Sequence, residues 1–170
     1  MGLNGSLSHI VLPRIDISKV PTLDLSKYYT IKIYVGWRAS LVDKKIFCIG
    51  NEEPLPIEID KYPKGKLPYQ MDGIFLNDIG GGYQFMPDDI YVPGYETIKY
   101  SERLNTMEKQ FGIRIDVRET VDFTTLVGDI ADFYKDGFHT MIRRIDSPYH
   151  VNIEKSEIDP DTFIFYNIYK

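Results

Sequence analysis

The sequence predicts an α+β fold: a single domain, residues 1–170, in which a mainly antiparallel sheet packs against one long and one shorter helix. Segments with alternating apolar residues occur near both ends of the chain, and this alternation is typical of strands with one buried face. Two further stretches carry apolar residues at helical spacing. A chain of this length can build one hydrophobic core, and no repeat or linker divides it.

The N-terminal part combines an irregular arm with three predicted strands. Residues 1–26 lack a regular period and contain prolines, so they are predicted to form the arm. Alternating residues predict strands at 28–35, 37–42 and 45–49, the last two around a turn at residues 43–44. Connections this short favour an antiparallel meander.

Residues 50–94 are rich in proline and glycine. Proline removes a backbone donor, so only short strands are predicted in this segment. They are expected at residues 57–60, 73–76, 83–86 and 90–92. Asp72-Gly73 and the three glycines at 80–82 predict tight turns. A strand pattern follows the glycine run, whereas a phosphate-binding loop would be followed by a helix.

Two helices are predicted in the second half of the chain. The shorter one spans residues 96–110, with Met107 and Phe111 on its apolar face and Gly112 at its end. Alternation then predicts a strand at residues 113–118.

The longer helix is expected at residues 122–145, because apolar residues recur there at steps of three and four. They are Phe123, Leu126, Val127, Ile130, Tyr134, Phe138, Met141 and Ile145. Gly137 follows Asp136, and such a pair also ends helices, which leaves residues 138–145 open between helix and strand. The apolar spacing across Gly137 favours one continuous helix. Strands are predicted at 149–153 and 162–169, the second of them central in its sheet or covered by a partner, because both of its faces are apolar.

Composition narrows the classes of partner. Twenty basic and 25 acidic residues give a net charge of −5, and the basic residues form no stripe, so no nucleic-acid partner is expected. The chain has no start resembling a signal peptide and no apolar run that spans a bilayer, so no membrane partner and a cytoplasmic location are expected. The single Cys48 lies in an apolar run, which predicts a core residue and excludes an intrachain disulfide.

No catalytic residue, metal site or cofactor is predicted. The candidate nitrogen and sulfur ligands are His9, His139, His150 and Cys48, and no pair of them has the spacing of a metal site. No nucleophile motif is present either, which favours a non-catalytic protein.

One segment has the composition of a protein-binding surface, because it combines tyrosines, an aromatic ring and acids within a loop-rich region. The predicted partner-binding residues are Phe85, Asp88, Asp89, Tyr91, Tyr95 and Tyr100. Packing of the tyrosines on the following helix explains the pattern equally well.

The sequence therefore favours a protein that works by binding other proteins. It would be a small acidic inhibitor or immunity-type protein, or a subunit of a larger assembly such as a viral or mobile-element particle, and a homo-oligomer is compatible with both. The rival hypothesis is a small enzyme with its site in residues 80–95.

Overall fold

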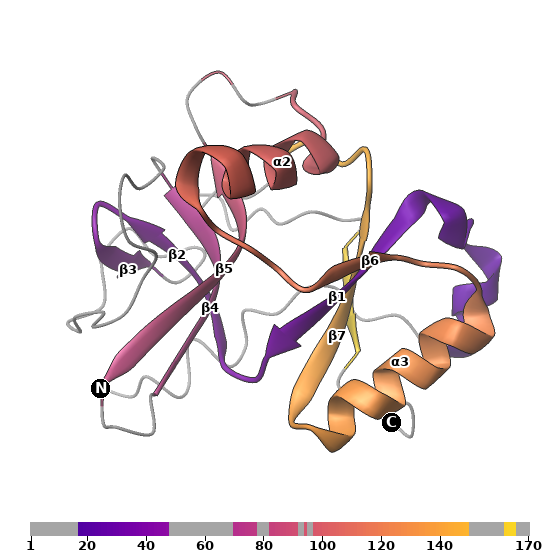
Figure 1. Ribbon diagram of the computed structural model, residues 1–170. Helices are drawn as coiled ribbons and strands as arrows, with labels where there is room; N and C mark the ends of the chain where they lie inside the picture. The colour runs from indigo at the N-terminus through magenta and orange to yellow at the C-terminus, as the bar shows by residue number, and fades with distance from the viewer. Residues whose placement is uncertain are drawn as a thin grey trace.

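The computed structural model describes residues 17–47, 70–77, 82–91, 94, 97–149 and 162–165. Their elements form an α+β fold with two four-stranded antiparallel sheets (Figure 1), which confirms the predicted fold class. Sheet A has the strand order β6-β1-β7-β8, and sheet B has the order β3-β2-β4-β5. The elements in chain order are η1 (Ile17–Thr22), η2 (Leu25–Lys27), β1 (Tyr28–Tyr34), β2 (Trp37–Val42), β3 (Lys45–Phe47), β4 (Gln70–Asn77), β5 (Tyr83–Tyr91), α2 (Tyr100–Phe111), β6 (Val117–Glu119), α3 (Phe123–Lys135), β7 (Phe138–Arg144) and β8 (Phe163–Phe165).

The first two strands belong to different sheets, so the predicted three-strand meander is wrong. β1 pairs with β6 and β7, whereas β2 pairs with β3 and β4. The chain passes from one sheet to the other at Gly36. A Cβ there would lie 2.6 Å from the carbonyl oxygen of Phe75 and 2.4 Å from the side chain of Ile74. The predicted turn between β2 and β3 is confirmed, and both of its residues, Asp43 and Lys44, have positive φ, as a tight hairpin requires.

The continuous helix favoured for residues 122–145 is wrong. α3 ends at Lys135, and Gly137, with φ 85°, turns the chain into β7. β7 lies between β1 and β8 and is covered on both faces, so it carries apolar residues without the alternation of a half-buried strand. The two helices are consequently similar in length, with 13 residues in α3 and 12 in α2.

β4 and β5 are long strands where only short ones were predicted. The turn predicted at Asp72-Gly73 is also wrong, because both residues lie inside β4. Asp72 is opposite Asp89 and Gly73 is opposite Pro87, which leaves Asp88 as the extra residue of a β-bulge. The bulge interrupts the ladder, and β5 can therefore contain a proline.

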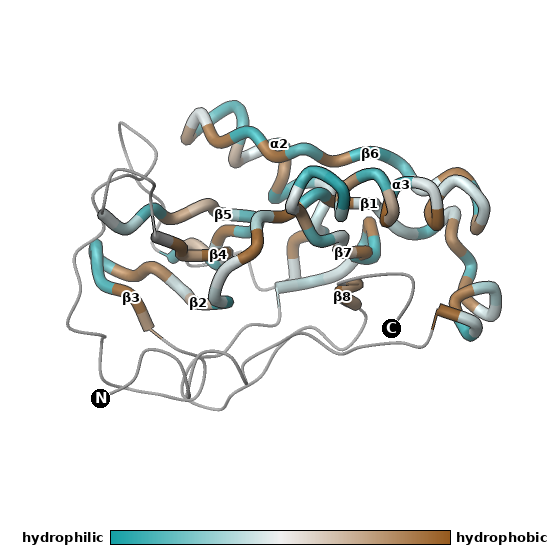
Figure 2. Tube along the Cα trace, turned by 90° about the horizontal axis from the view of Figure 1, so that it is seen from below, coloured by the Kyte–Doolittle hydropathy of each residue, from teal (hydrophilic) through white to brown (hydrophobic). Residues whose placement is uncertain are grey.

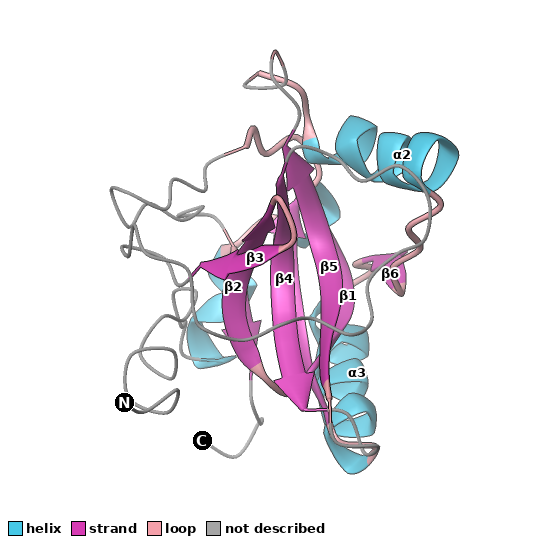
Figure 3. Ribbon diagram, turned by 90° about the vertical axis from the view of Figure 1, so that its left-hand side faces the viewer, coloured by secondary structure: helices cyan, strands magenta, loops and turns pink. Residues whose placement is uncertain are grey.

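Three apolar clusters among the described residues hold the layers together. α2 covers one face of sheet B (Figure 3), where Met107 and Phe111 meet Phe75 and Phe85. α3 and η1 cover the outer face of sheet A (Figure 1). The inner face of sheet A, with Ile31, packs against the α2 side of the molecule. Both helices carry apolar and polar residues in alternation along the tube (Figure 2), as amphipathic helices do.

Other predictions have mixed outcomes. Residues 17–26 belong to the arm expected to be irregular, yet most of them lie in η1 and η2. Only Val117 and Arg118 of the predicted strand at 113–118 belong to a strand, β6. β8 lies at the end of the order of described strands in sheet A rather than between two of them. The strand predicted at 57–60 lies outside the described residues. No helix in the described ranges combines the length and apolar character needed to cross a membrane.

Gly73→Ala should destabilise the protein by about 2–3 kcal/mol, because the new Cβ would lie 2.2 Å from the carbonyl oxygen of Met86 and 2.8 Å from Cα of Pro87. Gly128→Ala is the matched control. Gly128 lies in the middle of α3, and a Cβ added there would have no neighbour within 4 Å, so this change should stabilise by up to about 1 kcal/mol. Urea unfolding of both variants measures the difference, and equal effects would contradict the bulge geometry.

Candidate functional site between the two sheets

Five charged side chains from four elements meet in the interior between the sheets. They are Arg38 of β2, Asp88 and Asp89 of β5, Arg103 of α2 and Arg143 of β7, and each is at most 8% exposed. Charged side chains are rarely buried unless they are paired, so the network of contacts among them decides how the elements meet.

Asp89 is the centre of this charge cluster. Its Oδ1 accepts hydrogen bonds from Nε of Arg103 at 2.8 Å and from the backbone N–H of Ile90 at 2.8 Å. Its Oδ2 accepts from Nη2 of Arg103 at 3.0 Å and from Nη1 of Arg143 at 3.1 Å. One carboxylate therefore connects α2, β5 and β7, and through them both sheets.

The remaining donors of the two arginines also have partners. Nη1 of Arg103 donates to the carbonyl oxygens of Ile98 at 2.6 Å and Ser147 at 2.7 Å. Nε of Arg143 donates to Oγ1 of Thr162 at 3.1 Å. Both guanidinium groups lie beside the ring of Tyr100, at 5.3 and 4.6 Å from its centroid. The cluster is thus a satisfied polar core.

Asp88, the extra residue of the bulge, belongs to a second ion pair. Its carboxylate accepts hydrogen bonds from the guanidinium group of Arg38. Its backbone carbonyl accepts a hydrogen bond of 2.7 Å from the hydroxyl of Tyr100, and burial raises the pKa of that hydroxyl far above its ordinary value. The bulge thus directs Asp88 toward Arg38 on the neighbouring part of the sheet.

Asp89→Asn should cost about 3–5 kcal/mol of unfolding free energy, because it leaves two buried arginines without their shared counter-charge. Asp146→Asn provides the control, since Asp146 forms an ion pair with Arg144 at the surface and such pairs contribute about 0–1 kcal/mol. Chemical denaturation measures the unfolding free energy of both variants and would show this difference. A loss below about 1 kcal/mol for Asp89→Asn would show that the cluster does not support the fold.

Asp72 of β4 forms a separate polar group in the interior. Its Oδ1 accepts hydrogen bonds from the hydroxyl of Ser40 and, at 3.0 Å, from Nε2 of Gln70. Nε2 of Gln70 also donates to the hydroxyl oxygen of Tyr149 at 2.7 Å. Among the residues that the structure describes, Oδ2 of Asp72 has no hydrogen-bond partner. Burial first, and the charge of Asp89 second, raise the pKa of Asp72 from 3.8 to about 6, against the opposing hydrogen bonds from Ser40, Tyr149 and Gln70.

The raised pKa of Asp72 predicts that stability falls with rising pH. Between pH 3.8 and about 6 the folded protein still holds this proton, whereas the unfolded chain has lost it. The contribution of Asp72 to the unfolding free energy is therefore full below this window and is lost above it. The total effect is about 3 kcal/mol. Asp72→Asn cannot titrate and should remove this fall, which unfolding measured across the window would detect; an unchanged pH profile would contradict the assignment.

A cavity of about 300 Å³ lies beside the Arg38–Asp88 pair, with walls from both sheets and from the segment between α2 and β6. Its lining residues are Lys32, Ile33, Tyr34, Ile74, Met86, Pro87, Asp88, Arg114, Ile115, Asp116 and Phe138. Nζ of Lys32 lies 3.2 Å from Oδ2 of Asp116 and 4.6 Å from the centroid of Phe138. The rings of Phe138 and Tyr34 meet edge to face at 5.1 Å. The lining therefore combines apolar residues, aromatic rings, the cations Lys32 and Arg114 and the carboxylates of Asp88 and Asp116.

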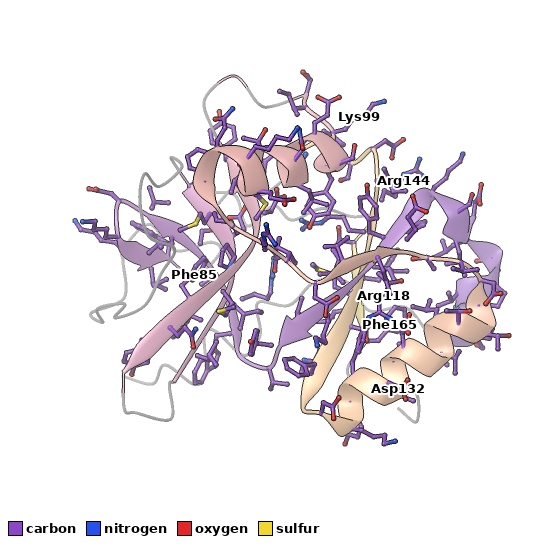
Figure 4. The ribbon with its side chains drawn as sticks, in the orientation of Figure 1. Phe85, Lys99, Arg118, Asp132, Arg144 and Phe165 are labelled. Carbon is purple, nitrogen blue, oxygen red and sulfur yellow. The ribbon has the colours of Figure 1, made fainter. Side chains whose placement is uncertain are left out.

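The predicted partner-binding residues do not form an exposed patch. Asp88, Asp89, Phe85 and Tyr100 are at most 2% exposed, and Figure 4 shows Phe85 on β5 in the sheet that α2 covers. Tyr91 is half-buried, with its ring 4.9 Å from that of Tyr149, and Tyr95 lies outside the described residues. The tyrosine segment thus packs inward where it is described, which was the alternative explanation of its composition.

Sequence reasoning missed the cations that pair with these acids. A signal for Arg103 was present, because it falls at helical spacing with Tyr100, Met107 and Phe111 on the buried face of α2. An arginine on an apolar face predicts a buried counter-charge. Among the metal candidates, His139 lies in β7, where burial lowers its pKa, and His9, Cys48 and His150 lie outside the described residues.

Comparison with known proteins gives a likeness of fold. No family model matches the chain, and no curated protein matches it. A solved structure described as "DNA binding with a minimal scaffold: Structure-function analysis of Lig E DNA ligases" is similar, with a TM-score of 0.59 and 14% sequence identity. The match covers 88% of this chain and 66% of that chain, slightly less than two thirds of its length.

This likeness corrects the expectation that nucleic acid is excluded as a partner. A chain with a similar fold is described as binding DNA, so the acidic composition of this chain is not a sufficient ground for the exclusion. Net charge is summed over the whole surface, whereas nucleic acid meets only the local arrangement of cations.

Proposed function

We propose that this protein binds nucleic acid and holds one nucleotide unit in the cavity between the two sheets. The observation that carries the proposal is the cavity itself, about 300 Å³ in volume, whose lining includes Lys32, Arg114 and Phe138. Cavities of this size accommodate small ligands. The similar fold of a DNA ligase described as binding DNA supports the class of ligand, although a fold alone does not determine function.

The two cations of the cavity can accept phosphate at low cost. Lys32 is paired with Asp116, whose side chain is 45% exposed. Arg114 is paired with Glu108 at 3.7 Å, and its side chain is 84% exposed. Ion pairs at the surface contribute about 0–1 kcal/mol, so a phosphate group, which forms charge-assisted hydrogen bonds, can replace either carboxylate.

The apolar walls suit an unpaired base. Ile33 and Ile74 come from opposite sheets, and the ring of Phe138 lies beside Lys32. Stacking of a base on an aromatic side chain contributes about 1–3 kcal/mol and tolerates any base, because every base has a π-face. A base that is still paired in a duplex would have to leave its stack before it could enter.

Binding should depend only weakly on salt. Two cations at the site neutralise about two phosphates, which predicts a slope of log affinity against log salt of roughly −1.4 for a single strand. The net charge of −5 opposes the wide contacts that give steep slopes.

The test is a fluorescence-anisotropy titration of a short labelled single-stranded DNA against the wild-type protein and three variants. Lys32→Ala and Arg114→Ala should each weaken binding about fivefold, or roughly 1 kcal/mol. Lys45→Ala is the charge-matched control, since Lys45 is exposed on β3 and does not line the cavity. It should change the affinity much less, because it keeps both cations of the site.

Two results would contradict the proposal. One is a wild-type protein that does not bind the strand at low salt. The other is an equal loss of affinity in Lys45→Ala and in the two cavity variants, which would indicate a diffuse charge effect rather than a site.

A further inference from the structure

Residues 145–149 form a connection between the two sheets, which we name the strap. The strap leaves the end of β7 beside the start of α2 (Figure 1), where the backbone N–H of Ser101 donates to the carbonyl of Ile145 at 3.0 Å. Arg103 then donates to the carbonyl of Ser147 at 2.7 Å. The strap thus crosses from sheet A toward sheet B along the buried charge cluster.

The far end of the strap is held by sheet B. The hydroxyl of Tyr149 accepts a hydrogen bond from Gln70, and its ring packs against Tyr91. Gln70 and Tyr91 are cross-strand neighbours at one end of β4 and β5. Tyr149 therefore closes the interior at that end.

Asp72 lies under this contact and is surrounded on several sides. Ser40 of β2, Gln70 of β4 and Tyr149 of the strap contribute hydrogen bonds that act on its carboxyl group. The charge of Asp89 on β5 acts on it as well, and Arg103 of α2 and Arg143 of β7 are paired with Asp89. Oδ2 has no hydrogen-bond partner within the described ranges, which makes the ionised form costly while the strap is in place.

We propose that protonation of Asp72 holds the strap closed and that ionisation of Asp72 loosens it. With the strap displaced, water reaches Oδ2 and hydrates the carboxylate, whereas the neutral acid gains little from that hydration. The two positions of the strap thus bind the proton with different affinity, and pH shifts their populations. This inference does not depend on nucleic-acid binding.

The direction and the size of the pH effect follow from the difference in proton affinity between the two positions of the strap. The closed form has a pKa of about 6 at Asp72, and the limit for a hydrated carboxyl group is the ordinary value of 3.8. A rise in pH through this window removes the proton from the open form first, so it favours opening. The ratio of open to closed molecules can increase by at most roughly a hundredfold.

The test is amide hydrogen exchange of Ser147 and Ser101, whose N–H groups donate to the carbonyls of Arg144 and Ile145, with protection corrected for the intrinsic effect of pH on exchange. Wild-type protection should fall between pH 3.8 and about pH 6, by roughly a hundredfold at most, and should change little at higher pH. Asp72→Asn, a neutral side chain of nearly the same shape, should keep the protection of low pH throughout. Asp132→Asn is the control and should behave as the wild type, because Asp132 lies on α3, far from the strap (Figure 4).

A flat profile in the wild-type protein would overturn the inference, and this result needs no variant to fold. The same fall in Asp72→Asn as in the wild type would also overturn it, because the titrating group would then be another one. Tyr149→Phe offers an independent readout: loss of the bond with Gln70 should lower protection at acidic pH as well, and unchanged protection there would contradict the role of the hydroxyl.

Discussion

The carboxylate of Asp89 is the contact on which the arrangement of this protein depends. It accepts hydrogen bonds from Arg103 and Arg143, and these three side chains lie on α2, β5 and β7. Buried ion pairs of this kind add little net stability over an apolar core of equal shape, because desolvation is costly. These ion pairs instead favour one arrangement of the fold, because any other placement of the helix or of either sheet would leave a charge buried without a partner.

The backbone of sheet B serves the same arrangement. Gly73 lets the β-bulge form opposite it, and the bulge directs Asp88 toward Arg38. The cavity lies directly beside this pair, and Asp88 lines it. In a strand without the bulge, the side chain of Asp88 would point elsewhere. Residues of the sheet A wall, among them Lys32 and Phe138, complete it. The proposed binding site is thus a result of how two sheets are joined rather than of a local motif.

Local patterns predicted much of the secondary structure, because they depend on neighbours in the sequence. The strands at β1, β2 and β3, the turn between the last two and the end of α2 at Gly112 all follow from alternation and turn residues. Patterns failed where long-range contacts decide. The apolar spacing across Gly137 fits a helix, yet pairing with β1 along seven residues makes that segment a strand. Asp88 and Asp89 look like surface acids in sequence, because their arginine partners lie 14 to 54 positions away.

The residues of the proposed binding site were harder to predict from the sequence than the fold. Lys32 and Arg114 are far apart in sequence and meet only because β1 and the segment after α2 line one cavity. The net charge sums these two cations with acids elsewhere in the chain, and this sum led to the mistaken exclusion of nucleic acid as a partner. One signal was readable in advance, the arginine on the apolar face of α2.

The most direct test of the central claim is a double-mutant cycle between Asp89 and Arg143, measured by the unfolding free energies of Asp89→Asn, Arg143→Gln and the double variant. If this contact joins the two sheets, the coupling free energy should be at least about 1.5 kcal/mol, since residues in one buried network are not additive. Additive effects, with a coupling near zero, would contradict the account.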